Sequence, residues 1–256
     1  MKADEMSKVK KKTVCMLAAM AALVLIAGAA FGGIKRYRVH LREQERKQSG
    51  IVLAFDDYSP DNWEQYFDLF DEYDAKVTFF VNAAYPTEFC EAARKRGHEI
   101  GCHTTGHANL TELTEEEIYE QAIAPIAVFR EAGYEFTTFA YPYGAYTDEL
   151  NELLLQHYNV VRGAFKCEPH VKDYMKRGFV ESMSLDNANY ESREQYEARI
   201  LEILTVMSEA EEGAVVPVYS HAIGDGDWCV TEENLEFLLQ KAKEMDLKFY
   251  TFQELQ

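Results

Sequence analysis

Positive charge is scarce through most of this sequence. Residues 48–256 carry 15 basic and 40 acidic side chains, a formal charge of −25, which repels polyanions and argues against a nucleic-acid partner. No glycine-rich phosphate loop follows an apolar run, which argues against a dinucleotide-binding fold. The cysteines contain no C-x-x-C, so a zinc site built on thiolates is not supported. The four beyond residue 47, Cys90, Cys102, Cys167 and Cys229, allow three disulfide pairings, and free thiols fit equally well.

The first 49 residues hold what the remainder lacks, a basic flank and a long uncharged run. Thr13 to Ile34 is uncharged and long enough to cross a bilayer, and the lysines in 8–12 favour a cytoplasmic N-terminus. Ala27-Gly28-Ala29 has the form of a signal-peptidase site, so a cleaved, secreted form is the alternative, and a buried soluble helix is a third. The predicted division is a cytoplasmic tail over 1–12, a transmembrane signal anchor over 13–34, a polar linker over 35–49 and one domain over 50–256.

From Ile51 onward, short apolar runs alternate with helical patterns, which is typical of an α/β protein with a parallel sheet. Six to seven such units predict a distorted, seven-stranded (β/α) barrel, and an open doubly wound sheet is the alternative. Thr114 and Glu117 predict a helix N-terminus, and Pro125 predicts a kink or break in that helix. Pro217 within a late apolar run predicts an edge strand or an irregularity. The stretch from about residue 165 to Asn189 is expected to be irregular.

Polar side chains follow four of the predicted strands. The carboxyl ends of barrel strands meet at one rim, so these residues are expected to lie together: Asp56 and Asp57, His103 and His107 in HTTGH, Tyr143 in PYG, and His221. Taken singly, each group is also typical of solvated turns or surface histidines. Together they predict a hydrolytic site, because two imidazoles and a carboxylate are a common open set of metal ligands. A cation would also let two adjacent carboxylates stay ionised.

The segments AFDDYSP, HTTGH, FAYPYG and YSHAIGDGDW resemble, in order, four motifs of the polysaccharide deacetylase family (carbohydrate esterase family 4, the NodB homology domain). The resemblance covers about residues 50–256, which it identifies as the catalytic domain. It implies the following roles: Asp56 as catalytic base, Asp57, His103 and His107 as metal ligands, the Tyr143 backbone N–H as oxyanion donor, and His221 as catalytic acid.

The sequence departs from the family pattern at three places. Ala140 stands where an Arg often orients the catalytic Asp, and Arg162 is one candidate to replace it. Asp186 in MSLDNANY is the best match to the Asp that orients the catalytic His, although a solvated turn fits it as well. Tyr58 replaces a usual Gly and, with Tyr143 and Trp228, is expected to form an aromatic wall for sugar rings or to pack in the core.

The resemblance implies a metal-dependent hydrolase that removes N-acetyl groups from N-acetylglucosamine or N-acetylmuramic acid units of a cell-surface polysaccharide such as peptidoglycan. Zn²⁺ is the expected metal, with Co²⁺, Ni²⁺ or Fe²⁺ as alternatives. We expect a monomer, held in the cell membrane by its N-terminal helix, with an extracytoplasmic catalytic domain. The alternatives are an O-acetyl esterase acting on a xylan-like glycan and a non-catalytic wall-binding descendant.

Overall fold

The computed structural model describes residues 48–164, 170–171, 178–210 and 213–256. Residues 47–256 form one compact unit. The predicted tail and anchor, most of the predicted linker, and Cys167 lie outside the described residues. Within the described ranges, no helix is both long and apolar enough to cross a membrane.

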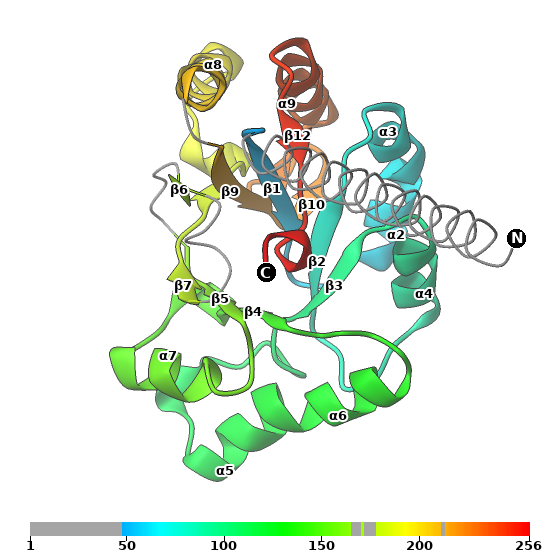
Figure 1. Ribbon diagram of the computed structural model, residues 1–256, viewed down its shortest axis with the longest axis vertical. Helices are drawn as coiled ribbons and strands as arrows, with labels where there is room; N and C mark the ends of the chain where they lie inside the picture. The colour runs from blue at the N-terminus through cyan, green and yellow to red at the C-terminus, as the bar shows by residue number, and fades with distance from the viewer. Residues whose placement is uncertain (1–47, 165–169, 172–177, 211–212) are drawn as a thin grey trace, which may run out of the picture. The chain divides into compact units, whose positions relative to one another are not determined.

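The centre of the domain is a curled sheet, which Figure 1 shows with helices around its outside. Across the described residues it has the strand order β6-β9-β1-β2-β3-β4-β5-β7, with β12 also beside β1 and β8 beside β9. Pairing in this sheet is parallel except between β6 and β9. The strands are β1 (Gly50–Phe55), β2 (Val77–Val81), β3 (Glu99–Cys102), β4 (Thr138–Ala140), β5 (Val160–Arg162), β6 (His170–Val171), β7 (Gly178–Val180), β8 (Met183–Ser184), β9 (Ala214–Ser220) and β12 (Lys248–Phe249), and a separate pair comprises β10 (Ala222–Ile223) and β11 (Cys229–Val230).

Thr114, Thr147, Ser192 and Thr231 each begin a helix with a side-chain cap. Thr114 and Glu117 form the predicted capping box, and the helix they start is broken before Pro125 as expected. The helices are α2 (Pro60–Trp63), α3 (Phe67–Glu72), α4 (Glu88–Lys95), α5 (Glu115–Ile118), α6 (Ala124–Glu131), α7 (Asp148–Leu154), α8 (Arg193–Glu209) and α9 (Glu232–Glu244). Shorter turns are η1 (Glu64–Tyr66), η2 (Leu110–Glu112), η4 (Pro142–Gly144), η6 (Asn187–Asn189), η7 (Gln253–Leu255) and a π-helical turn, η3 (Tyr119–Ile123).

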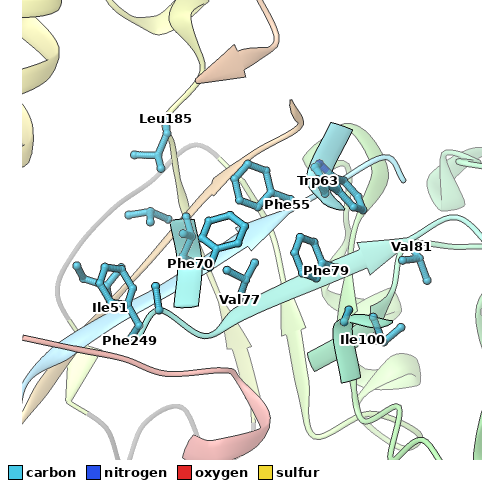
Figure 2. Close-up of a cluster of buried hydrophobic side chains, with 14 of the residues drawn as sticks. Ile51, Phe55, Trp63, Phe70, Val77, Phe79, Val81, Ile100, Leu185 and Phe249 are labelled. Carbon is cyan, nitrogen blue, oxygen red and sulfur yellow. The ribbon is translucent and has the colours of Figure 1, made fainter. Parts of the chain in front are cut away.

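Strand β1 is buried on both faces, because alternate side chains point to opposite sides of a sheet. Ile51, Leu53 and Phe55 pack in the larger apolar cluster beneath the helices, whereas Val52 and Ala54 pack in a second cluster on the concave side. Figure 2 shows the aromatic part of the larger cluster, where Phe55, Trp63 and Phe79 gather. The rings of Trp63 and Phe79 stack with centroids 5.1 Å apart. This packing holds the end of β1, and therefore the residues that follow it, in place.

The amino-terminal ends of β2, β3 and β4 are tied to the C-terminal turn by the fully buried Glu99. Its carboxylate accepts hydrogen bonds from the hydroxyls of Thr78 (2.9 Å) and Thr138 (2.7 Å) and from the backbone N–H of Gln253 (3.0 Å). Burial raises the pKa of Glu99 despite these bonds. The polar groups therefore close this end of the curled sheet, and the other end is left for chemistry.

The predicted α/β class with a parallel sheet is confirmed. In the described residues the hydrogen-bonded path stays open, since β7 pairs with β5, β8 pairs with β9, and two residues join β7 to β8. These two short strands lie in a stretch predicted to be irregular, and their two or three residues are too few to show a period. Pro217 lies in β9 between the residues that pair with β6 and those that pair with β8, so it marks the predicted irregularity rather than a free edge.

Candidate active site

The carboxyl ends of the strands bring the predicted residues to one cavity. Asp56 and Asp57 follow β1, His103 follows β3, and His221 follows β9. Together with Tyr143 from η4, these side chains line a cavity of about 420 Å³. The expectation that four strand ends share one rim is therefore confirmed.

Asp57, His103 and His107 form a compact cluster whose potential ligand atoms all lie within 4.8 Å of one another. Asp57 Oδ1 lies 3.1 Å from His103 Nε2 and 2.9 Å from His107 Nε2. His103 is only 2% exposed, and its Nδ1 lies 2.8 Å from the carbonyl oxygen of Ala140. Because that oxygen can only accept, Nδ1 donates to it, and Nε2 is the ring nitrogen that faces the Asp57 carboxylate. A carboxylate oxygen and ring nitrogens that face one another in this way can bind one cation between them, so the donor set suits a divalent metal.

The charges in this cluster also suit a cation. Burial alone would raise the pKa of Asp57, but the hydrogen bond from His103 and the charges of three neighbouring histidines lower it overall. Burial lowers the pKa of His107, which favours its neutral imidazole. A carboxylate and neutral imidazoles are the forms in which these side chains bind metals.

The backbone around the cavity is unusual. Several non-glycine residues there adopt left-handed conformations, which L-residues rarely do. These residues are Asp57 (φ 74°), Tyr58 (φ 59°), Thr104 (φ 63°), His107 (φ 54°) and Tyr143 (φ 59°). Such strain persists where surrounding contacts enforce it, and it is concentrated at functional sites.

Arg162 provides the partner for Asp56 that the sequence left open. Its Nη2 donates to Asp56 Oδ2, and the guanidinium is 1% exposed, lying over the rings of Phe80 and Tyr219. Arg162 on β5 is in register with Ala140 on β4. The cation therefore comes from the neighbouring strand, directly beside the position where the family pattern often has Arg. The other carboxylate oxygen, Asp56 Oδ1, is buried and has no hydrogen-bond partner in the described residues.

His221 is held by Asp186, the residue that the sequence matched only weakly. His221 Nδ1 lies 2.9 Å from Asp186 Oδ2, and Asp186 also accepts from the hydroxyls of Ser184 (2.8 Å) and Ser220 (2.6 Å). His221 Nε2 lies 3.9 Å from Asp57 Oδ2, so it faces the Asp57 cluster. Burial by itself would lower the pKa of His221, but the hydrogen bond to Asp186 and the nearby carboxylates raise it overall. The His221–Asp186 pair can therefore hold a proton at Nε2 of His221.

The predicted aromatic wall is formed by two of its three residues. Tyr143 and Trp228 line the cavity and are 63% and 67% exposed, with the Tyr143 ring 4.5 Å from that of His107. Tyr58 instead packs against Trp63 and Phe89, and its hydroxyl lies 2.6 Å from Thr87 Oγ1.

The cavity is also lined by Tyr141, Gly144, Ala164 and Tyr219, to which the sequence analysis assigned no role. Tyr219 lies in β9, two positions before His221, which follows the strand. Residues two apart in extended chain share a face, so this spacing was a usable signal.

Comparison with known proteins points to one family. Residues 43–160 match the sequence model of the polysaccharide deacetylase family. A peptidoglycan-N-acetylglucosamine deacetylase from Listeria monocytogenes is 32% identical over 107 residues, which cover 40% of this chain and 23% of that protein. A peptidoglycan-N-acetylmuramic acid deacetylase from Bacillus subtilis is 33% identical over 108 residues, with the same coverage of both chains. The chain thus spans about a quarter of the length of these curated relatives.

Longer matches are more distant. A putative polysaccharide deacetylase from Bacillus subtilis is 25% identical over 221 residues, which cover 82% of this chain and 70% of that protein. The structure of a peptidoglycan deacetylase from Bacillus subtilis aligns with a TM-score of 0.56 at 22% identity, covering 82% of this chain and 91% of that one. A chitin deacetylase from Colletotrichum lindemuthianum aligns with a TM-score of 0.56 at 17% identity, covering 82% and 88%. At these identities the structural likeness shows a shared fold.

Proposed function

We propose that this chain, which belongs to the polysaccharide deacetylase family, is a metal-dependent hydrolase that removes N-acetyl groups from a cell-wall polysaccharide. The observation that carries the proposal is the arrangement of three units around one cavity: the Asp57–His103–His107 cluster, the Asp56–Arg162 pair and the His221–Asp186 pair. N-acetylglucosamine or N-acetylmuramic acid units of peptidoglycan are the proposed substrate, since curated relatives are named for both.

Asp57, His103 and His107 would hold the metal, and Zn²⁺ is the proposed ion because it favours such ligands with positions left open. A divalent cation there would supply Lewis acidity for a carbonyl group and for water. Arg162 occupies the Oδ2 atom of Asp56, so the unpaired Oδ1 is the atom proposed to accept a proton from water.

His221 is the proposed acid. Asp186 accepts a hydrogen bond from the Nδ1–H group of His221. Nε2 is therefore the nitrogen that delivers a proton to the leaving amine. The Tyr143 backbone N–H is proposed to stabilise the oxyanion, and the rings of Tyr143 and Trp228 to contact the sugars. Asp186 acts through His221 and is a positioning residue.

The curled sheet is best understood as a distorted seven-stranded barrel. β7 and β8 pair with opposite ends of the strand path, and only Glu181 and Ser182 separate them. The chain itself would thus close the ring that hydrogen bonds leave open. We also propose that the protein acts as a monomer.

The test is acetate release by the purified full-length chain, before and after zinc loading, from peptidoglycan and from O-acetylated xylan. The proposal predicts zinc-dependent acetate release from peptidoglycan, with about one metal ion per chain. Release from xylan alone would replace the deacetylase with an esterase. A chain that binds zinc but releases no acetate would favour a wall-binding role, and one that binds no metal would overturn the proposal at its base.

A further inference from the structure

The segment that joins His103 to His107 is bonded to one residue of the π-helical turn η3. The backbone N–H of Thr105 donates to the main-chain carbonyl of Gln121 (3.0 Å). The backbone N–H of Gly106 donates to the side-chain Oε1 of the same residue (3.0 Å). Gln121 thus accepts two successive backbone donors of this segment, which we call the ligand loop (residues 104–106).

The carbonyl of Gln121 is available because of Pro125. In an α-helix the N–H of residue 125 would bond to the carbonyl of residue 121, but proline has no N–H. The helix is π-helical over Tyr119–Ile123 and resumes as α6 at Ala124. π-helical turns are uncommon and occur frequently at functional sites. Here the irregular helix presents an acceptor that a regular helix would have used internally.

The ligand loop needs outside support because its backbone is strained. Thr104, its first residue, and His107, which follows it directly, both have positive φ angles. The two histidines also differ in how they are held. His103 is buried, its backbone N–H donates to the carbonyl of Val81, and its ring contacts the Ala140 carbonyl. The side chain of His107 is 27% exposed and contacts Asp57 and Tyr143. The position of His107 therefore depends on the loop that leads to it.

We propose that Gln121 is a positioning residue for the metal site. Its main-chain and side-chain carbonyl groups both hold the ligand loop, and in this way Gln121 sets the distance between the two histidine ligands. The inference rests on the proposed metal site. Its consequence is a site preorganised for the ion, so that binding does not have to order the loop. Gln121 contacts neither substrate nor metal in this assignment.

The test compares zinc affinity in variants of the full-length chain. Gln121→Met removes the side-chain acceptor while keeping length, and Gln121→Ala serves in its place should the Met variant fail to fold. Gln121→Glu keeps acceptor oxygens. Gln240→Met, on the exposed face of α9, is the matched control. The dissociation constant for zinc is measured by competition with a chelator, and the melting temperature of each metal-free variant is measured alongside.

Gln121→Met should weaken zinc binding on the order of tenfold, as loss of a supporting contact around metal ligands typically does. Gln121→Glu and Gln240→Met should bind zinc at least as tightly as wild type. Zinc affinity within twofold of wild type in Gln121→Met, or equal losses in the Met and Glu variants, would overturn the inference. A wild-type chain that binds no zinc overturns the metal site and the inference together, which distinguishes the two failures.

Discussion

Asp56 and Asp57 are adjacent in the chain yet belong to different units of the site. Asp56, directly after β1, is buried and pairs with Arg162, whereas Asp57, with its positive φ, turns toward His103 and His107. Adjacent residues of an extended chain point in opposite directions, and the left-handed turn at Asp57 completes the separation. Each carboxylate therefore has its own partners, a guanidinium for Asp56 and two imidazoles for Asp57.

This separation predicts different outcomes for two matched substitutions. Asp56→Asn should keep zinc binding and fold but lose about 10²–10⁴ in kcat, because an amide cannot accept the proton. Asp57→Asn should lose zinc as well as activity. Zinc content and acetate release measured on both variants check this, with Asp61→Asn, on the neighbouring α2, as the control. Loss of zinc in Asp56→Asn would show that the two carboxylates act as one ligand set.

At the scale of elements, strand β5 provides the charged partner of Asp56 that the family pattern often places on the neighbouring strand β4. The guanidinium that pairs with Asp56 belongs to Arg162 on β5, which is in register with Ala140 on β4. It lies over the rings of Phe80 and Tyr219 in the concave cluster. A side chain as long as Arg can reach the same point from either strand. The identity of one strand residue is therefore less constrained than the position of the charge.

The contact between β3 and the helical layer predicts a pH dependence of stability. His98, just before β3, is buried against Phe67, Phe70 and Phe79, and burial lowers its pKa to about 4. The unfolded chain binds this proton near pH 6.5, so the stabilisation is complete above that pH and is lost as pH falls toward 4. The linked change in unfolding free energy is about 3 kcal/mol in total and about 2 kcal/mol by pH 5.

His98→Asn should remove the contribution of His98 to the pH dependence of the unfolding free energy. Asn can still accept the hydrogen bond that the Val77 N–H donates to His98 Nδ1, but it does not titrate. Urea unfolding at pH 7 and pH 5 should show wild type losing about 2 kcal/mol more than His98→Asn. His157→Asn, at an exposed position, should follow the wild-type pH dependence. Parallel pH dependences in wild type and His98→Asn would contradict the prediction.

At the scale of the whole molecule, charge divides the chain. Of the 44 acidic side chains, 40 lie in residues 48–256, whereas the first 47 residues hold 11 of the 26 basic ones. We propose that 13–34 is a membrane anchor and that the domain lies outside the cytoplasm. By the positive-inside rule, the lysines in 8–12 support this orientation, whereas the basic residues over 35–47 oppose it. The proposed wall-polysaccharide substrate lies outside the cytoplasm, and this favours the orientation with the domain outside.

Protease added to intact cells whose wall has been removed should therefore digest the domain and leave only a fragment that includes the anchor. An antibody to an N-terminal tag and another to the domain follow the two parts by blotting. A cytoplasmic marker protein must survive as the control. Full protection of the domain until lysis would refute both this topology and the wall substrate, whereas its release into the medium would indicate a cleaved signal.

The sequence by itself determined the class of fold, the strand ends and the side chains that follow them. Those features are local, because apolar runs, capping residues and motif spacing act over a few positions. Only the tertiary structure decided that Arg162 pairs with Asp56, that Asp186 holds His221, that Gln121 supports the ligand loop and that Tyr58 packs away from the cavity. The first two pairs join residues 106 and 35 positions apart. Strand register and sheet curvature bring such residues together, and both depend on packing across the whole domain rather than on any short stretch of chain.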